Sequence, residues 1–480
     1  MNLFALFGRS LPLVLAIALP PSPPPAAPPL LEETATFGRF GTVHLYRPAA
    51  APSRVALFIS GDGGWNLGVV EMGRALARLD SLVIGVDVTH YLRETRAAAE
   101  KCTYTAADFE ALGQYVQHRL GLPTYTPPVL VGYSSGATLV YATLRQAPVG
   151  TFVGGISMGF CPDLPLARPL CRGEGLEWKP GPGGKGIWFL PAPKLQARWI
   201  ALQGEIDQVC DSHLVASYVE QVPSARLVPL PGVGHGFSVP AHWLPQLQQA
   251  YKSLDPDAPP AAQRTSTAEG SARLDDLPLV ELPAAPGVAS SRLAVMVSGD
   301  GGWAGLDREL GAAFAERGIP VAGLNSLKYF WTRRTPDAAA ADLARILRHY
   351  LSAWNRERAI LIGYSLGADV LPFMVARLPP ELRQRIDLVL LLGPSARAEF
   401  QFHLSNWLGG RSEDEALPTR PEIDKLAGTP LTCACGEDDP ECICKELPSS
   451  LARIMLFKGG HHFGGEYENL ATQVLSTLAD

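Results

Sequence analysis

Two serines stand in the pattern G-x-S-x-G, each between an aliphatic run and a stretch with helical periodicity. Ser134 lies in GYSSG (132–136), and Ser365 lies in GYSLG (363–367). In this pattern the serine occupies a sharp turn from strand to helix, and the flanking glycines remove side chains that would collide there. The start of the helix directs its N–H groups and positive dipole end toward the serine oxygen. Both serines are therefore predicted nucleophiles.

A serine nucleophile needs a histidine base, and the base needs a carboxylate that orients it. With a G-x-S-x-G serine, these residues follow in the chain order Ser, acid, His. In the first half, the strand-like segment WIALQGEIDQVC nominates Asp207, and the segment LVPLPGVGHGF nominates His235. Ser134, Asp207 and His235 form the first predicted triad.

The second half repeats this order with more candidates. The segments LTCACGEDDPEC and IMLFKGGHHF follow Ser365. Alignment of their glycines on those of the first half selects Asp439 as the acid and His461 as the base. Neighbouring side chains compete for both roles, and the alternatives are Glu437, Asp438 and His462.

The developing oxyanion needs two backbone N–H groups, one of them from the residue after the serine. That residue is Ser135 in the first half and Leu366 in the second. The motif SGDGGW, which follows an earlier aliphatic run in each half, is expected to supply the other N–H group. The alternative, a phosphate-binding loop, lacks the required lysine and glycine spacing, so no nucleotide is expected. The candidate donors lie within Gly61–Gly64 and Gly299–Gly302, with Gly63, Gly64, Gly301 and Gly302 preferred.

Eight cysteines divide evenly between the halves. Cys210 and Cys442 lie at matching positions, where a disulfide would brace the loop that carries the acid. The C-x-C-x6-C-x-C cluster could instead bind zinc, but zinc sites usually contain C-x2-C spacing. Disulfides are therefore expected, with no metal and no cofactor, and their pairing stays open. The cysteines are Cys102, Cys161, Cys171, Cys210, Cys433, Cys435, Cys442 and Cys444.

The elements that must position these residues are themselves duplicated. SGDGGW, G-x-S-x-G and the G-H-x-F segment recur in the same order at offsets of 238, 231 and 226 residues. In each half, continuous aliphatic runs such as 54–60 and 292–298 alternate with amphipathic stretches. This alternation predicts a mostly parallel sheet covered by helices on both faces. The expected fold is therefore two tandem α/β-hydrolase domains.

Composition sets the boundaries. The segment LPLVLAIAL (11–19) followed by PPSPPPAAPP predicts a signal peptide and Pro-rich leader over 1–29. The N-terminal domain is expected over 30–254 and the C-terminal domain over 291–480. Between them, residues 255–290 are rich in Pro, Ala, Ser and Thr, which is typical of a flexible linker.

Charge and hydrophobicity exclude several classes of protein. The 480-residue chain is 47% hydrophobic and 18% charged, with a net charge of −6. That hydrophobic content excludes a disordered chain, and the acidic balance without basic runs argues against a nucleic-acid partner. The cysteine usage and the leader together favour export.

The second half also resembles a known family. Its SGDGGW, NSLKYFWTRRTP (325–336), GYSLGADVLPF (363–373), LLGPS (391–395) and GGHHF (459–463) look like the VirJ/AcvB family of bacterial virulence proteins. The two-copy layout is similar to that of the AcvB type. The first half departs from the signature, since VDVTHYLRET (86–95) replaces NSLKYFWT, so its substrate and activity are left open.

The resemblance implies hydrolysis of lysyl- or alanyl-phosphatidylglycerol in the periplasm, with possible association with the inner membrane. It implies Ser365, a carboxylate of the loop Glu437–Glu441 and His461 or His462 as the catalytic residues. The expected partner is an aminoacyl-phospholipid at a membrane surface, and the oligomeric state is open. Phe330, Trp331 and Trp407 could form an apolar mouth or pack in the core. The alternatives are a general exported carboxylesterase or peptidase, and a secretion-associated binding protein with unused triads.

Overall fold

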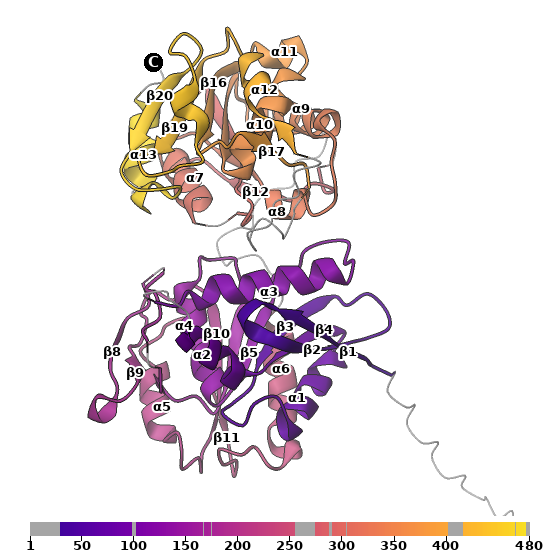
Figure 1. Ribbon diagram of the computed structural model, residues 1–480, viewed down its shortest axis with the longest axis vertical. Coiled ribbons are helices and arrows are strands. Elements are labelled where there is room, and N and C mark those ends of the chain that lie inside the picture. The colour runs from indigo at the N-terminus through magenta and orange to yellow at the C-terminus, as the bar shows by residue number, and fades with distance from the viewer. Residues whose placement is uncertain are drawn as a thin grey trace, which may run out of the picture.

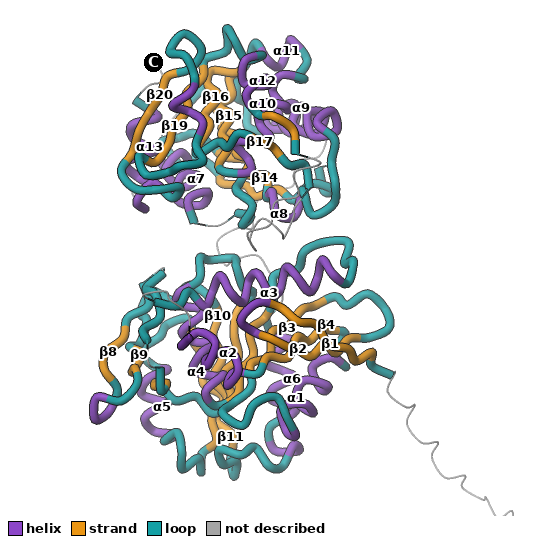
Figure 2. Tube along the Cα trace, in the orientation of Figure 1, coloured by secondary structure: helices purple, strands orange, loops and turns teal. Residues whose placement is uncertain are grey.

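The computed structural model describes residues 29–97, 102–166, 168–173, 175–254, 274–287, 290–303, 305–401, 416–465 and 467–476. The predicted leader up to residue 28, Trp407 and most of the predicted linker lie outside these ranges. The described chain forms two α/β domains in sequence order (Figure 1). In each, strands lie at the centre with helices around them (Figure 2).

The first domain contains an eight-stranded sheet in the order β1-β2-β4-β3-β5-β6-β10-β11. The strands from β4 onward in this order are parallel, and β1 and β2 pair antiparallel at one edge. This is the strand order of the α/β-hydrolase sheet. The strands are β1 (Leu31–Phe37), β2 (Gly41–Arg47), β3 (Arg54–Ile59), β4 (Ser81–Val86), β5 (Val129–Tyr133), β6 (Gly154–Met158), β10 (Arg198–Gly204) and β11 (Ala225–Leu230).

Helices cover both faces of this sheet because its side chains alternate between two apolar cores. Val55, Leu57 and Ile59 of β3 face one core, and Ala56 and Phe58 face the other. The helices are α1 (Leu67–Ala77), α2 (Val88–Ala97), α3 (Thr105–Arg119), α4 (Ser135–Gln146), α5 (Ser212–Val219) and α6 (Leu244–Ser253). A small antiparallel sheet is inserted before β10, and its strands are β7 (Asp163–Leu164), β8 (Trp178–Pro180) and β9 (Ile187–Phe189).

The second domain repeats the arrangement with one strand fewer, in the order β12-β14-β13-β15-β16-β19-β20. Helices α7 and α13 pack on one face of the sheet, and α9, α10 and α12 pack on the other. The strands are β12 (Leu279–Leu282), β13 (Arg292–Val297), β14 (Val321–Leu324), β15 (Arg358–Tyr364), β16 (Ile386–Leu392), β19 (Leu431–Gly436) and β20 (Arg453–Phe457).

The helices of this domain are α7 (Leu306–Glu316), α8 (Ser326–Tyr329), α9 (Pro336–Ala353), α10 (Leu366–Ala376), α11 (Pro380–Arg383), α12 (Arg420–Asp424) and α13 (Tyr467–Leu475). A two-stranded ribbon joins β17 (Arg397–Ala398) to β18 (Leu417–Pro418). Within the described ranges, no helix combines the length and the apolar character that a membrane crossing requires.

The sequence-based fold is confirmed, with two differences. The predicted linker extends to residue 290, but β12 lies inside it and pairs antiparallel with β14. Leu274 and Leu277, just before β12, are buried in the second core, so apolar anchors end the linker earlier than its composition indicates. The hairpin β1–β2 is an element that the sequence analysis does not predict, although it lies within the expected first domain.

Candidate active sites

Each G-x-S-x-G serine lies at the turn between a central strand and the following helix. Ser134 joins β5 to α4 with φ 54°, and Ser365 joins β15 to α10 with φ 53°. Positive φ is rare for a serine and marks a strained turn that holds the side chain outward. A Cβ atom at Gly136 or Gly367 would overlap carbonyl oxygens at the end of the neighbouring strand, which explains why glycine stands there.

The first domain brings its three predicted residues together by hydrogen bonds. Ser134 Oγ lies 2.9 Å from His235 Nε2, and His235 Nδ1 lies 2.9 Å from Asp207 Oδ2. The loop after β10 places the acid and the loop after β11 places the histidine, at the carboxyl edge of the sheet. These two contacts connect the residues in the order found in a Ser-His-Asp triad.

Several donors hold the first acid in place. Asp207 Oδ1 accepts the backbone N–H groups of Val209 at 2.8 Å and Cys210 at 2.9 Å. Asp207 Oδ2 also accepts the Gln203 side-chain amide at 3.1 Å. The carboxylate is 6% exposed, so its hydrogen bonds to protein groups replace those it would make to water. The acid is thereby fixed to orient His235.

In the second domain the structure selects among the competing residues. His461 Nδ1 lies 2.7 Å from Asp439 Oδ2. Asp439 is buried, whereas Glu437 and Asp438 are exposed, so the turn after β19 directs only Asp439 toward the histidine. His462 instead pairs through Nδ1 with the Tyr364 hydroxyl at 2.8 Å. Burial, and then the neighbouring His461, lower the pKa of His462.

The serine of the second domain is not yet engaged. Ser365 and His461 line one cavity, but within the described chain no hydrogen bond joins Ser365 Oγ to His461. Such contacts are often long without substrate and tighten when it binds. The second site therefore has an assembled acid–base pair beside an available serine.

The glycine loops lie where an oxyanion donor is required. A Cβ atom on Gly61 would lie 3.0 Å from Ser134 Cβ, and one on Gly299 would lie 3.6 Å from Ser365 Cβ. However, the Gly64 N–H donates to Gly61 O, and the Gly302 N–H donates to Gly299 O. These turns remove Gly64 and Gly302 from the predicted donors.

The remaining predicted donors keep suitable positions. Gly63 and Gly301 precede the glycines used in the turns, and in the described chain neither N–H is bonded to another backbone group. Ser135 and Leu366 begin α4 and α10, where the first N–H groups of a helix have no partner within the helix. The predicted oxyanion donors are therefore Ser135 and Gly63 in the first domain, and Leu366 and Gly301 in the second. Both pairs stay predictions.

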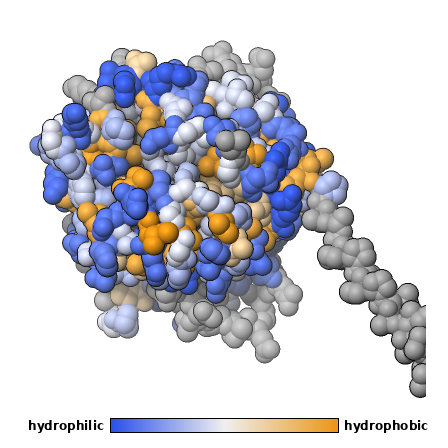
Figure 3. Space-filling view, turned by 90° about the horizontal axis from the view of Figure 1, so that it is seen from below, coloured by the Kyte–Doolittle hydropathy of each residue, from blue (hydrophilic) through white to orange (hydrophobic). Residues whose placement is uncertain are grey.

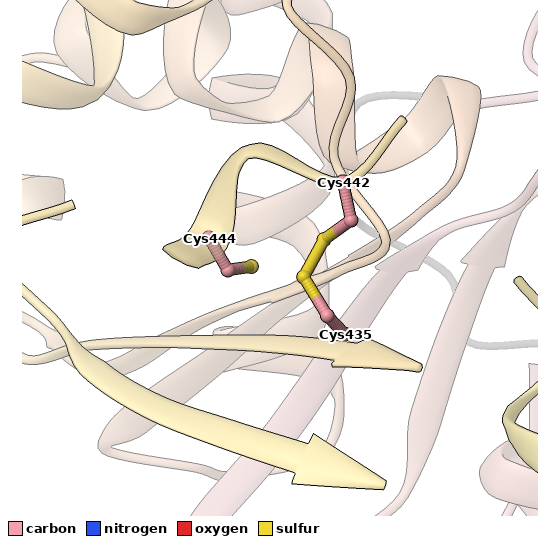
Figure 4. Close-up of side chains that lie close together, drawn as sticks. All are labelled: Cys435, Cys442 and Cys444. Atoms are coloured by element: carbon pink, nitrogen blue, oxygen red, sulfur yellow. A yellow bond between two sulfur atoms is a disulfide. The ribbon is translucent and has the colours of Figure 1, made fainter. Parts of the chain in front are cut away.

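All eight cysteines form disulfides, so the zinc alternative is wrong. Two bonds brace the acid loops, as the matching positions of Cys210 and Cys442 indicated. Cys210 pairs with Cys161, and Cys442 pairs with Cys435 at the end of β19 (Figure 4). The other bonds are Cys102–Cys171 and Cys433–Cys444. Four disulfides indicate an oxidising compartment.

A cavity of about 1420 Å³ opens over the second site and is rich in carboxyl side chains. Its described lining includes seven Asp or Glu side chains and one arginine, Arg397. Asp307 and Asp369 are buried there, and burial holds the pKa of each carboxyl well above its usual range. Asp369 accepts a hydrogen bond from Ser395, whereas Asp307 Oδ1 has no hydrogen-bond partner among the residues that the structure describes. Carboxyl groups therefore outnumber basic side chains in the described lining.

The predicted apolar mouth is not formed by the two aromatics that the structure describes. Phe330 is 0% exposed and packs against Phe400 within the second domain. Trp331 is 4% exposed and packs in the core of the first domain. Both side chains therefore have packing roles, the alternative that the sequence left open.

A family model described as "Bacterial virulence protein (VirJ)" matches residues 53–151 and 291–480. No protein with a curated description matches the chain. Similar solved structures include dienelactone hydrolase from Anabaena variabilis, 17% identical, covering 47% of this chain and 96% of that chain with TM-score 0.34. Est1E from Butyrivibrio proteoclasticus is 14% identical, covering 46% and 96% with TM-score 0.30. The esterase domain of a Rhodothermus marinus protein is 16% identical, covering 46% and 97% with TM-score 0.32.

Proposed function

The chain belongs to the VirJ family of bacterial virulence proteins, and from this premise we propose that its second domain is a serine hydrolase of aminoacyl-phosphatidylglycerol. The observation that carries the proposal is the acidic cavity over Ser365 and His461. An aminoacyl ester carries an ammonium group close to the scissile carbonyl, and acidic walls favour such a ligand over a neutral or anionic one. The four disulfides support a periplasmic location.

The reaction follows from the proposed roles. Ser365 Oγ attacks the ester carbonyl carbon while His461 Nε2 takes the hydroxyl proton, and Asp439 stabilises the imidazolium. The Leu366 N–H and the loop Gly299–Gly302 bind the oxyanion. The C–O bond to the lipid glycerol breaks as His461 protonates that oxygen, which releases phosphatidylglycerol. Water, activated by His461, then hydrolyses the acyl-enzyme and releases the amino acid.

The test is hydrolysis of lysyl- and alanyl-phosphatidylglycerol in detergent micelles, followed by mass spectrometry of the lipid. Ser365→Ala should lower the rate by about 10⁴-fold or more, because the nucleophile is lost. Ser134→Ala is the matched control and should retain activity within about twofold. Turnover that survives Ser365→Ala would refute the assignment, as would a wild-type protein inactive on both lipids.

We also propose a second hydrolase centre in the first domain, because its Ser134, His235 and Asp207 are fully connected by hydrogen bonds. Its surroundings differ, since Ile206, Val209 and Val239 on the adjoining loops are 61%, 68% and 49% exposed. Figure 3 shows the molecule from the side of this domain, where hydrophobic residues lie among hydrophilic ones. An apolar rim favours an ester with an apolar acyl chain.

Aryl esters of acetate and octanoate test this second function in a Ser365→Ala background. The octanoate ester should be hydrolysed at least about tenfold faster than the acetate ester, since the longer chain buries more apolar surface. Addition of Ser134→Ala should remove this activity. Hydrolysis that persists without both serines would contradict the assignment.

A further inference from the structure

The first domain forms one wall of the cavity over the second domain's serine. Its contribution comes from the first half of α3 and from the loop between α4 and β6 (Figure 1). We call these residues the roof, and they are Tyr104, Ala106, Ala107, Glu110, Pro148 and Thr151.

A tryptophan of the second domain attaches the roof. Trp331 Nε1 donates to the Leu122 carbonyl of the first domain at 2.7 Å. Its ring lies 5.7 Å from the His118 ring and 5.4 Å from the Tyr125 ring, centroid to centroid. A buried aromatic with its N–H satisfied across a boundary is a strong anchor. The roof therefore has a defined position over Ser365.

The first domain's own triad does not share this cavity. Pro148 and Thr151 precede β6, at the amino edge of the parallel sheet. Ser134 follows β5 at the carboxyl edge, and a five-residue strand separates the two edges by about 16 Å. The first domain thus acts on the second site with the face opposite its own candidate site.

Glu110 is the one charged side chain in the roof as described. It is partly buried, and within the described chain it has neither a hydrogen bond nor an ion pair. Burial, and then the negative charge of Asp300 across the cavity, raise its pKa to about 8. An ionised carboxylate is costly to bury without a partner of opposite charge. A ligand cation beside Glu110 would offset that cost.

Two buried polar atoms near the roof have no hydrogen-bond partner among the described residues. Asp307 is 2% exposed and lines the cavity, with its Oδ1 unpaired. The buried Tyr125 hydroxyl, whose pKa is raised by burial and then by the nearby Glu110, also has no hydrogen-bond partner within the described chain. Buried polar atoms normally find a partner. Asp307 lines the same cavity as Glu110, and the Tyr125 hydroxyl lies within electrostatic range of Glu110, so an unpaired polar atom of each domain lies near the roof.

We propose that Glu110 of the roof is a specificity residue that binds the ammonium group of the aminoacyl ester cleaved at Ser365, so the first domain selects the substrate of the second. This inference rests on the proposed lipid hydrolysis. It adds that a residue of the first domain, Glu110, binds the cationic group of the substrate. None of the described roof residues is an arginine or a lysine, so the roof itself supplies no cation to Glu110.

The experiment compares full-length wild type with Glu110→Gln on lysyl-phosphatidylglycerol and on neutral 4-nitrophenyl butyrate, the latter in a Ser134→Ala background. Glu110→Gln should lower kcat/KM for the lipid about tenfold, chiefly through KM, and leave the neutral ester within twofold. Glu220→Gln, an exposed carboxylate of the same domain, is the matched control and should change neither. Glu110→Asp should recover part of the lost activity.

A second measurement keeps the proposal testable if the lipid is not the substrate. Lysinamide, a small dication, should inhibit neutral ester hydrolysis at Ser365, and Glu110→Gln should weaken that inhibition about tenfold. Inhibition without lipid turnover would refute the lipid function while it supports the cation site. Equal inhibition of both proteins, or a parallel loss of lipid and neutral-ester activity in Glu110→Gln, would overturn the assignment to Glu110.

Discussion

The two domains hold the same catalytic residue types in different states of readiness. In the first, Ser134, His235 and Asp207 are already hydrogen-bonded, and exposed aliphatic side chains adjoin their loops. In the second, Asp439 and His461 are paired but Ser365 is not engaged, and another domain covers the cavity. The shared scaffold thus fixes the turns and loops, whereas the surroundings of each serine decide what can reach it.

The two domains can be compared residue by residue in the segments that follow β4 and β14. Tyr91 donates to Asp108 at 2.6 Å in the first domain, and Tyr329 donates to Asp342 at 2.7 Å in the second. Two residues after each tyrosine the copies diverge. The first has the exposed Arg93, and the second has Trp331, which anchors the roof. The Tyr–Asp hydrogen bond is thus common to both domains, whereas Trp331 occurs only in the second and contributes to the interface between them.

The largest expected effect is a difference in lipid hydrolysis between variants of the two predicted catalytic acids, Asp439 and Asp207. Asp439→Asn should lower hydrolysis of lysyl-phosphatidylglycerol by about 10⁴-fold, because His461 loses the carboxylate that orients it. Asp207→Asn should leave lipid hydrolysis unchanged and reduce octanoate ester hydrolysis in a Ser365→Ala background. Steady-state kinetics of both substrates measures the difference. Glu437→Gln is the exposed control, and a loss from it equal to that from Asp439→Asn would refute the choice of acid.

The next effect concerns the disulfides that brace the acid loops. Replacement of Cys161 and Cys210 by serine should lower the free energy of unfolding by about 4 kcal/mol, since that bond spans 49 residues. The same change at Cys435 and Cys442, which are seven residues apart, should cost about 2.5 kcal/mol. Denaturant unfolding of the two double variants measures the order. A larger loss from the shorter loop would contradict this account.

A smaller effect is expected at the joint between the domains. Trp331→Ala should weaken roof attachment by about 3 kcal/mol, because a buried aromatic and its hydrogen bond are lost. Lipid hydrolysis should fall about tenfold or more, while octanoate ester hydrolysis at Ser134 stays unchanged. The matched variant Arg93→Ala should alter neither rate. Equal losses at both sites would indicate general destabilisation instead of a detached roof.

The smallest effect is a pH dependence of stability at Glu110. Its pKa is raised in the folded protein, so the folded state favours the protonated form, and stability falls as pH rises from about 4.5 through about 8. Glu110→Gln removes that loss and should be more stable than wild type by about 1–2 kcal/mol at pH 9. The two proteins should unfold alike at pH 4. Thermal unfolding at both pH values tests the sign.

Much of each domain could be predicted from sequence because local pattern and order carry the information. The aliphatic runs 54–60 and 292–298 contain β3 and β13, and the glycines mark the turns at Ser134 and Ser365. The choice of Asp439 over Glu437 could not be made, since it depends on which side chain a four-residue turn directs inward. The disulfide pairing required the distances between loops.

No local sequence pattern predicts that residues of the first domain cover the second site. Glu110 lies on an ordinary amphipathic helix, and only the placement of α3 against the second domain gives it a cavity to line. Trp331 stood out in the sequence, but an aromatic at an apolar mouth and one in a core look the same there. Its burial in the other domain's core is a tertiary property.

The amino edge of one sheet packing over the carboxyl edge of the next makes a head-to-tail contact, in which each copy presents a different surface. A symmetric pairing would have forced one patch to serve both partners, and any substitution would have appeared twice in the interface. The head-to-tail contact between the two domains has no such constraint. One end of the first copy was free to become a selective surface for its neighbour, while the other kept its own reactive centre.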